Sequence, residues 1–247
     1  MSKILVVHTG GTISMKENQD GSVMETDIHP LSKMDLLNDY PMDEIHLFNL
    51  PSPHITPPNH MLQLTQFLNE KINTKQYKGI VITHGTDTLE ETAYFIDLTI
   101  KTKIPIVFTG AMRSSNEIGS DGLYNFISAL RVASDSKASD RGVLVVMNDE
   151  IHTAQYVTKT ATSNVATFQS PQFGPVGMVT KQDIYFYQKI YNEEIISVSS
   201  LTKKVLLLKA YAGMEKELID SISLTNIDGL IIEALGAGNI PPLLYQA

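Results

Sequence analysis

The sequence predicts an α/β protein with an open, mostly parallel sheet covered by helices on both faces, followed by a smaller, incomplete α/β domain. Short apolar runs alternate with segments of helical spacing, which is the pattern of βαβ units. The runs are continuously apolar, as expected of strands buried on both faces. Three of them end in glycine and hydroxyl residues, at the edge where open sheets bind ligands.

The first part of the pattern comprises two strands and a helix. Residues 4–7 form an apolar run that ends before two glycines, and 45–50 is a less hydrophobic strand candidate. Thr56-Pro57-Pro58 is a helix start, because proline is tolerated in the first turn. The apolar positions that follow have helical spacing: Met61, Leu64, Leu68 and Ile72.

A strand at 80–82 precedes a capping-box pattern, in which Thr88 is followed three residues later by Glu91. We expect the helix that begins there to end before Pro105. The large domain then continues with a strand, a helix, a strand and a hairpin, at 106–108, 123–132, 143–146 and 176–187.

The pattern indicates a large domain at 1–191, a polar, serine-rich linker at 192–204 and a partial second domain at 205–247. The second domain is expected to contain two strands and one short helix, at 205–208, 230–232 and 218–222. These elements are too few for an independent core.

Composition excludes several classes of function. The chain has no cysteine, so it forms neither disulfides nor zinc–thiolate sites and has no cysteine nucleophile. Its 27 acidic and 19 basic residues argue against nucleic acid as a partner. The apolar run before His8 is too short for a signal peptide, and no run approaches the ~20 residues of a membrane helix. We therefore expect a cytoplasmic protein with no membrane partner.

Cofactor and metal motifs are also missing from the sequence. Neither the phosphate-loop nor the dinucleotide-binding glycine pattern occurs. Asp149-Glu150 lacks nearby histidines in a ligand pattern and is better explained as acids on a loop. We predict no metal and no cofactor.

The first candidate motif is Thr9-Gly10-Gly11-Thr12-Ile13. Two glycines place the Thr12 hydroxyl on a tight turn whose backbone amides can hold a carboxylate or an oxyanion. By itself, the segment fits equally well a plain turn in which Thr12 bonds the backbone.

The second motif is His84-Gly85-Thr86-Asp87-Thr88. Asp87 can hold an amine and Thr86 offers a second hydroxyl, although Asp87 or Thr88 could simply cap the next helix. Further along, Lys159 lies among hydroxyl residues. A lysine acts as a base only where burial or nearby positive charge lowers its pKa, and an isolated lysine is more often solvated.

Together the two motifs resemble the paired signatures of the bacterial-type L-asparaginase family, and the N-terminus is most similar to its cytoplasmic members. The resemblance runs in order from residue 3 to about 190 and continues weakly to Gly238-Asn239. Supporting matches are Thr109-Gly110-Ala111-Met112-Arg113, Ser120-Asp121-Gly122 with Asn125, Asn148-Asp149-Glu150-Ile151, and Val157-Thr158-Lys159-Thr160.

The resemblance implies a role for each matching residue. Thr12 matches the nucleophile that forms an acyl-enzyme. Thr86, Asp87 and Lys159 match a second group, in which the lysine assists a threonine and the aspartate holds the substrate α-amine. Ser52 matches the serine that binds the α-carboxylate. Backbone contacts to substrate are implied at Gly11, Gly85 and Ala111.

The implied reaction is hydrolysis of L-asparagine to L-aspartate and ammonia. Alternatives are a glutamine-preferring amidase, the amidase component of an amidotransferase, or a catalytically impaired amino-acid-binding protein. The resemblance also implies a homodimer or homotetramer if the C-terminal domain is complete, with an acidic residue from a neighbour completing each site.

Two features depart from the family pattern. A tyrosine is usual in the mobile loop after the nucleophile, but residues 13–30 contain none and Ser22 stands near its place. The family's C-terminal domain normally extends well past 236–239, whereas this chain ends at Ala247. We therefore expect a C-terminally truncated chain, less stable and less active than an extended one.

Overall fold

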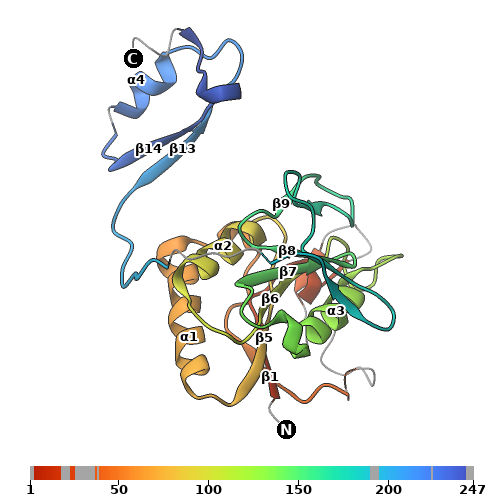
Figure 1. Cartoon of the computed structure of the whole chain (residues 1–247). Helices are drawn as coiled ribbons and strands as arrows, with labels where there is room; N and C mark the ends of the chain where they lie inside the picture. Colours follow the sequence, from red (N-terminus) through yellow and green to blue (C-terminus); the bar gives the residue numbers. More distant parts are fainter. Residues whose placement is uncertain are drawn as a thin grey trace. The chain divides into compact units, whose positions relative to one another are not determined.

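The computed structural model describes residues 3–17, 23–25, 37, 39–189, 195–223 and 225–242. The chain divides into two compact units, Met1–Ser199 and Ser200–Ala247. The first unit is built on an eight-stranded sheet of order β12-β11-β8-β7-β6-β5-β1-β4 (Figure 1).

Five neighbouring strands of this sheet run parallel, which confirms the predicted fold class. They are β1 (Lys3–His8), β4 (Met42–His46), β5 (Tyr77–Thr83), β6 (Ile106–Thr109) and β7 (Val143–Met147). Almost every position is buried in β1, β6 and β7 and in the second half of β5, because helices cover both faces of the sheet.

The remaining three strands are antiparallel: β8 (Glu150–Thr153), β11 (Gly177–Val179) and β12 (Ile184–Phe186). β11 and β12 confirm the hairpin predicted at 176–187. β8 was not predicted. Asn148 and Asp149 both have positive φ, 48° and 68°, and form the two-residue turn that folds β8 back onto β7.

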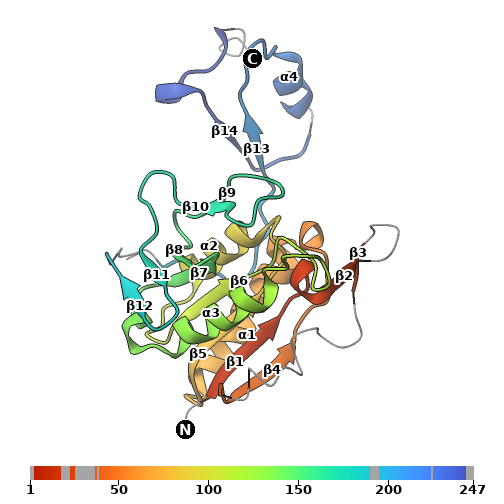
Figure 2. The ribbon, with the colours of Figure 1, turned by 90° about the vertical axis from the view of Figure 1, so that its right-hand side faces the viewer.

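Helices cover both faces of the sheet, as predicted (Figure 2). α1 (Leu62–Asn73) and α2 (Leu89–Thr99) pack on one face, against side chains such as Leu5 and Ile82. α3 (Gly122–Ser134) packs on the other face, against Val6 and Val81. Alternate residues of each strand therefore supply two separate cores.

The second predicted strand, at 45–50, was placed too far along the chain. β4 covers Met42–His46 and pairs with β1 from Ile4↔Met42 to His8↔His46. It is an edge strand, and none of its side chains is fully buried. Because polar residues occupy its exposed positions, the strand does not form a continuous apolar run in the sequence.

Short elements connect the main ones. They are η1 (Thr12–Ser14), β2 (Met15–Glu17), β3 (Val23–Glu25), η3 (Ser52–His54), η4 (Pro57–Met61), η5 (Ser136–Ala138), β9 (Thr158–Lys159) and β10 (Phe168–Gln169). β2 pairs with β3, and β9 with β10, both antiparallel. No helix in the described ranges is long and apolar enough to cross a bilayer.

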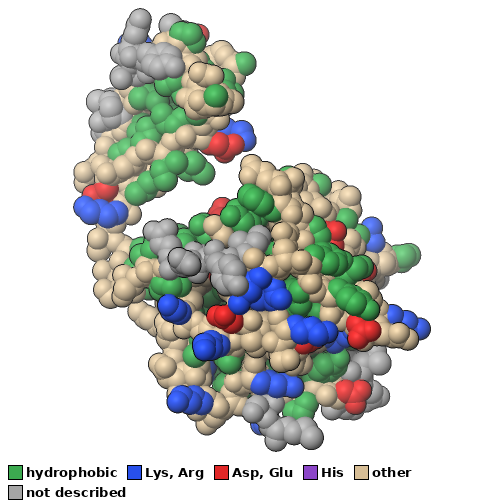
Figure 3. Space-filling model, in the orientation of Figure 1, with side chains coloured by type: hydrophobic (Ala, Val, Ile, Leu, Met, Phe, Trp, Pro, Cys, Tyr) green, Lys and Arg blue, Asp and Glu red, His purple; other side chains and the backbone are tan. Residues whose placement is uncertain are grey.

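The second unit contains β13 (Val205–Lys209), β14 (Gly229–Glu233), α4 (Glu217–Ser223) and η6 (Gly236–Gly238). The two strands are parallel and coincide with the predicted ones. Leu207 pairs with Ile231 in register, and these side chains are 70% and 57% exposed. Figure 3 shows hydrophobic side chains gathered on the visible face of this unit.

Candidate active site

Three loops meet at the carboxyl edge of the parallel sheet. They follow β1, β5 and β6, which are neighbours in the sheet. The Thr9 N–H donates to the Thr83 carbonyl (3.1 Å), and the His84 N–H donates to the Thr109 carbonyl (2.9 Å). These bonds extend the strand ladder, so the chain remains in step where the three loops begin.

Gly11 and Gly85 bring the first two loops into backbone contact. A Cβ added to Gly11 would lie 2.2 Å from the Gly85 Cα, and Gly11 has a φ of 89°. Only glycine combines that close approach with a positive φ. The next residues, Thr12 and Thr86, are thereby placed at the same edge of the sheet.

Thr12 begins the short helix η1 and is partly exposed. The turn is closed by Ser14, whose N–H and hydroxyl both donate to the Gly11 carbonyl (2.9 and 3.1 Å). No described residue forms a hydrogen bond with the Thr12 hydroxyl. In a plain turn the Thr12 hydroxyl would bond the backbone. Here the Ser14 hydroxyl makes the bond to the backbone instead.

Lys159 joins the second motif from a distant part of the chain. Its Nζ donates to Thr86 Oγ1 (3.0 Å) and to Asp87 Oδ1 (2.7 Å). The Lys159 side chain is only 17% exposed, whereas that of Asp87 is 56% exposed. Lys159 is therefore not a solvated surface lysine, and Asp87 keeps exposed surface for a further cation.

Ser52 lies against the second motif. Its Oγ accepts the Asp87 N–H (3.3 Å), and its carbonyl accepts the Thr88 hydroxyl (2.8 Å). A Cβ on Gly85 would lie 2.5 Å from Ser52 Oγ.

The predicted capping box is wrong, because Thr88 is the N-cap residue of α2 but its side chain makes no cap bond.

The loop that carries Ala111 is held by α3. The Asp121 carboxylate accepts the N–H groups of Met112 and Arg113 (3.0 Å each), and Asn125 Nδ2 donates to the Gly110 carbonyl (3.1 Å). In the sequence, Asp121 and Asn125 stand out only because they match the family pattern. Their contacts show that they fix the backbone around Ala111.

Of the predicted site residues, the structure brings Gly11, Ser52, Gly85, Thr86, Asp87 and Lys159 into a contiguous set. Thr12 joins through Gly11, and Ala111 joins because Gly110 and Thr86 are close: a Cβ on Gly110 would lie 3.2 Å from Thr86 Cγ2. Ser22 lies outside the described residues. Glu90, which bonds Thr158 and Lys159, was missed by sequence reasoning.

His84 is a buried packing group beside the site. Its Nδ1 bonds the Gly85 carbonyl (2.8 Å), and burial lowers the pKa of the ring to about 4, although this bond opposes the shift. In the unfolded chain the ring titrates near its ordinary value of about 6.5. Between these values the unfolded state therefore binds more protons than the folded state.

We expect the free energy of unfolding to decrease as pH falls from about 6.5 to about 4, with His84 contributing at most about 1.4 kcal/mol per pH unit. Urea unfolding across that range should show a shallower decrease in His84→Gln, which cannot titrate. Equal slopes for the wild type and the variant would show that His84 does not contribute.

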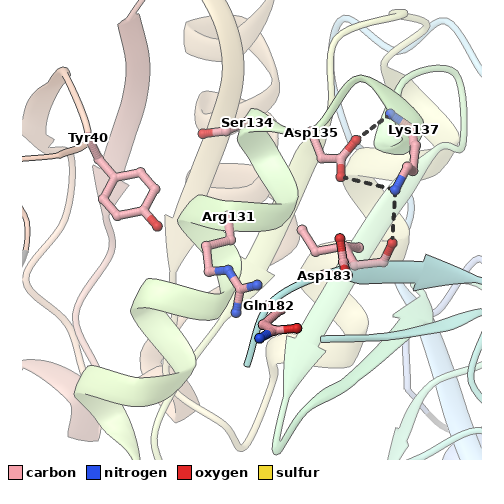
Figure 4. A pocket seen from close by; sticks show the side chains of 8 residues that line it. Tyr40, Arg131, Ser134, Asp135, Lys137, Gln182 and Asp183 are labelled. Atoms are coloured by element: carbon pink, nitrogen blue, oxygen red, sulfur yellow. Dashed lines mark hydrogen bonds and ion pairs between the residues drawn. The ribbon is translucent and has the colours of Figure 1, made fainter. Parts of the chain in front are cut away.

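A separate pocket lies at the far end of α3 (Figure 4). Its two cationic side chains already have hydrogen-bond partners: Arg131 Nη1 donates to the Thr180 carbonyl (2.7 Å), and Lys137 Nζ donates to the Ile184 carbonyl (3.2 Å). The loop that carries Ala111 contacts the opposite end of α3, where a Cβ on Gly122 would lie 3.3 Å from the Ala111 Cβ. The pocket is therefore not part of the candidate site.

Comparison with known proteins agrees with the geometry. The model of the family "Asparaginase, N-terminal" matches residues 3–192. An L-asparaginase of Bacillus licheniformis is 34% identical over 97% of this chain and 75% of its own length. A probable L-asparaginase of Deinococcus radiodurans is 36% identical over 99% of this chain and 75% of its own.

The fold agrees as well. A crystal structure of a probable cytoplasmic L-asparaginase from Campylobacter jejuni matches with a TM-score of 0.89 and 32% identity, over 100% of this chain and 78% of the other. Since the family model spans most of the sequence and relatives align over nearly all of it, the chain belongs to the asparaginase family.

Proposed function

We propose that the chain hydrolyses the side-chain amide of L-asparagine to L-aspartate and ammonia through an acyl-enzyme on Thr12. The observation that carries this proposal is the meeting of the Thr12 turn with Thr86, Asp87 and Lys159 at one edge of the sheet. The Thr12 hydroxyl, which bonds no residue of the described ranges, lies at the same sheet edge as a lysine–threonine pair that can move a proton.

In the proposed first step, Thr12 Oγ forms a bond to the amide carbon and its proton is transferred to the departing nitrogen, so that ammonia leaves. In the second step, water adds to the ester carbon, the bond to Oγ breaks, and the hydroxyl proton is restored. Lys159 and Thr86 relay protons across their 3.0 Å contact. Backbone N–H groups of the glycine loops stabilise the oxyanion.

The remaining residues bind the substrate's charged end. Asp87, with its exposed carboxylate, pairs with the α-ammonium, and Ser52 donates to the α-carboxylate. Backbone groups of Gly11, Gly85 and Ala111 contact the substrate around its side-chain amide. The steps proposed here use only side chains and backbone groups of the chain together with water.

The test is product analysis of the purified chain with L-asparagine and, in parallel, L-glutamine. We expect ammonia and aspartate in equal amounts from asparagine. Faster release from glutamine would instead indicate a glutamine-preferring amidase. Binding of asparagine without ammonia would support a binding protein and contradict the proposal.

We further propose a cytoplasmic homo-oligomer, a dimer or tetramer, with residues 1–191 as the catalytic domain, 192–204 as a linker and 205–247 as the second domain. The exposed pair Leu207 and Ile231 supports association through the second unit, because burying such side chains stabilises a subunit contact.

Leu207→Lys is expected to weaken self-association, since the charge would have to be desolvated in the contact. Light scattering over a concentration series should show a smaller mean mass for this variant. Thr202→Lys, which adds the same charge at an exposed polar position, is the matched control. Unchanged mass in Leu207→Lys would remove this strand face from the contact.

A further inference from the structure

The carboxylate of Glu90 connects the start of α2 to the strand that carries Lys159. It accepts hydrogen bonds from the Lys159 backbone N–H and from Thr158 Oγ1, the latter at 3.2 Å. Both donors lie on β9, 68 and 69 residues further along the chain. Glu90 itself lies in the first turn of α2, four residues after Thr86, whose hydroxyl Lys159 contacts.

The Lys159 N–H needs this partner because of its place in the β9–β10 pair. The Thr160 N–H donates to the Thr167 carbonyl at 2.8 Å, on the side of β10. In an antiparallel pair, successive N–H groups point to opposite sides, so the Lys159 N–H points away from β10. Glu90 occupies that open side, where its charge strengthens the bond.

An acidic residue in the first turn of a helix often serves only to stabilise the helix dipole. Glu91 shares that turn, and no bond joins it to β9 among the described residues. Stabilisation of the helix dipole therefore does not account for the two hydrogen bonds that Glu90 accepts from β9.

We propose that Glu90 is a positioning residue for Lys159. It fixes the backbone of Lys159 relative to α2, so that Nζ reaches Thr86 Oγ1 and Asp87 Oδ1 together. This inference rests on the proposed function, in which Lys159 relays protons with Thr86. The residue has no part in bond making, and its effect reaches the reaction only through the lysine.

The first arm of the test measures the contact itself. Amide hydrogen exchange of the peptide that contains Lys159 should be faster in Glu90→Ala than in the wild type, because the N–H loses its acceptor. Glu91→Ala, on the same helical turn, should leave exchange unchanged. Glu90→Gln retains one acceptor oxygen and should restore much of the protection. Thr158→Val removes one contact only and serves if Glu90→Ala does not fold.

The second arm measures the consequence for turnover. Glu90→Ala should lower kcat for asparagine on the order of 10- to 100-fold, the cost of a misplaced catalytic group, with little change in KM. Made in a Lys159→Met background, the same substitution should lower kcat hardly at all, because there is no amine left to position. Glu91→Ala should be close to wild type in both backgrounds.

Several results would overturn the inference. Unchanged exchange in Glu90→Ala would show that the contact does not hold Lys159. An equal loss of kcat with and without the lysine would indicate a general structural role instead of positioning. If the wild type releases no ammonia, the proposed function fails on that assay alone, while the exchange arm still decides whether Glu90 holds Lys159.

Discussion

Thr12→Ala is expected to lower kcat for asparagine on the order of 10⁴-fold or more, the scale on which loss of a nucleophile acts in hydrolases that use a hydroxyl. The substitution deletes the group proposed to form the acyl-enzyme. Because the side chain is partly exposed and its hydroxyl bonds no described residue, little stability should be lost. Thr12→Ser, which keeps a hydroxyl, should retain measurable turnover.

The measurement is continuous ammonia release, with thermal unfolding as the check that the variant is folded. A folded Thr12→Ala protein that turns over asparagine at the wild-type rate would show that Thr12 is not the nucleophile. Thr86 would then be the next hydroxyl to replace, since it stands at the same edge and bonds Lys159 directly.

Lys159→Met is expected to lower kcat by about 10²- to 10⁴-fold, the usual contribution of a positioned proton-transfer group. Methionine matches much of the lysine stem, so packing against the partly buried side chain should persist. The variant loses the contacts to Thr86 Oγ1 and Asp87 Oδ1, and with them the proposed proton relay.

Lys181→Met is the matched control, because Lys181 is exposed on the turn between β11 and β12. Initial rates at saturating asparagine across a range of pH should separate the two variants. A Lys159→Met protein with wild-type kcat and an unchanged pH profile would exclude the lysine from proton transfer.

The parallel core was predictable from the sequence because its strands are apolar at consecutive positions. Residues 4–7, 80–82, 106–108 and 143–146 all lie in strands of the sheet. Burial on both faces leaves no room for polar side chains, so the run itself marks the strand. The glycine and hydroxyl residues at three strand ends likewise indicated which edge would carry the candidate site.

The edges of the sheet could not be predicted in this way. β4 is only partly covered. β8 alternates apolar Ile151 with the polar residues Glu150 and His152, and its place in the sheet is fixed by pairing with β7 and β11. Pairing of this kind depends on partners far along the chain. In β8, the Asn148-Asp149 dipeptide was the available signal, since it suits a tight hairpin turn.

The same limit applies to the candidate site. Single motifs left open whether Asp87 capped a helix, and no periodicity could reveal that Thr88 bonds Ser52 or that Glu90 bonds β9. These contacts join segments that are 36 and 69 residues apart. Only the folded backbone brings them together, because loop conformation is set by tertiary packing and not by local propensity.

Trapping the acyl-enzyme with hydroxylamine tests the central proposal most directly. An ester on Thr12 would be attacked by hydroxylamine in competition with water, so the hydroxamate of aspartate should form while ammonia is still released from asparagine. Thr12→Ala should yield no hydroxamate. Ammonia and aspartate formed at the full rate with no hydroxamate at any hydroxylamine concentration would contradict the acyl-enzyme on Thr12.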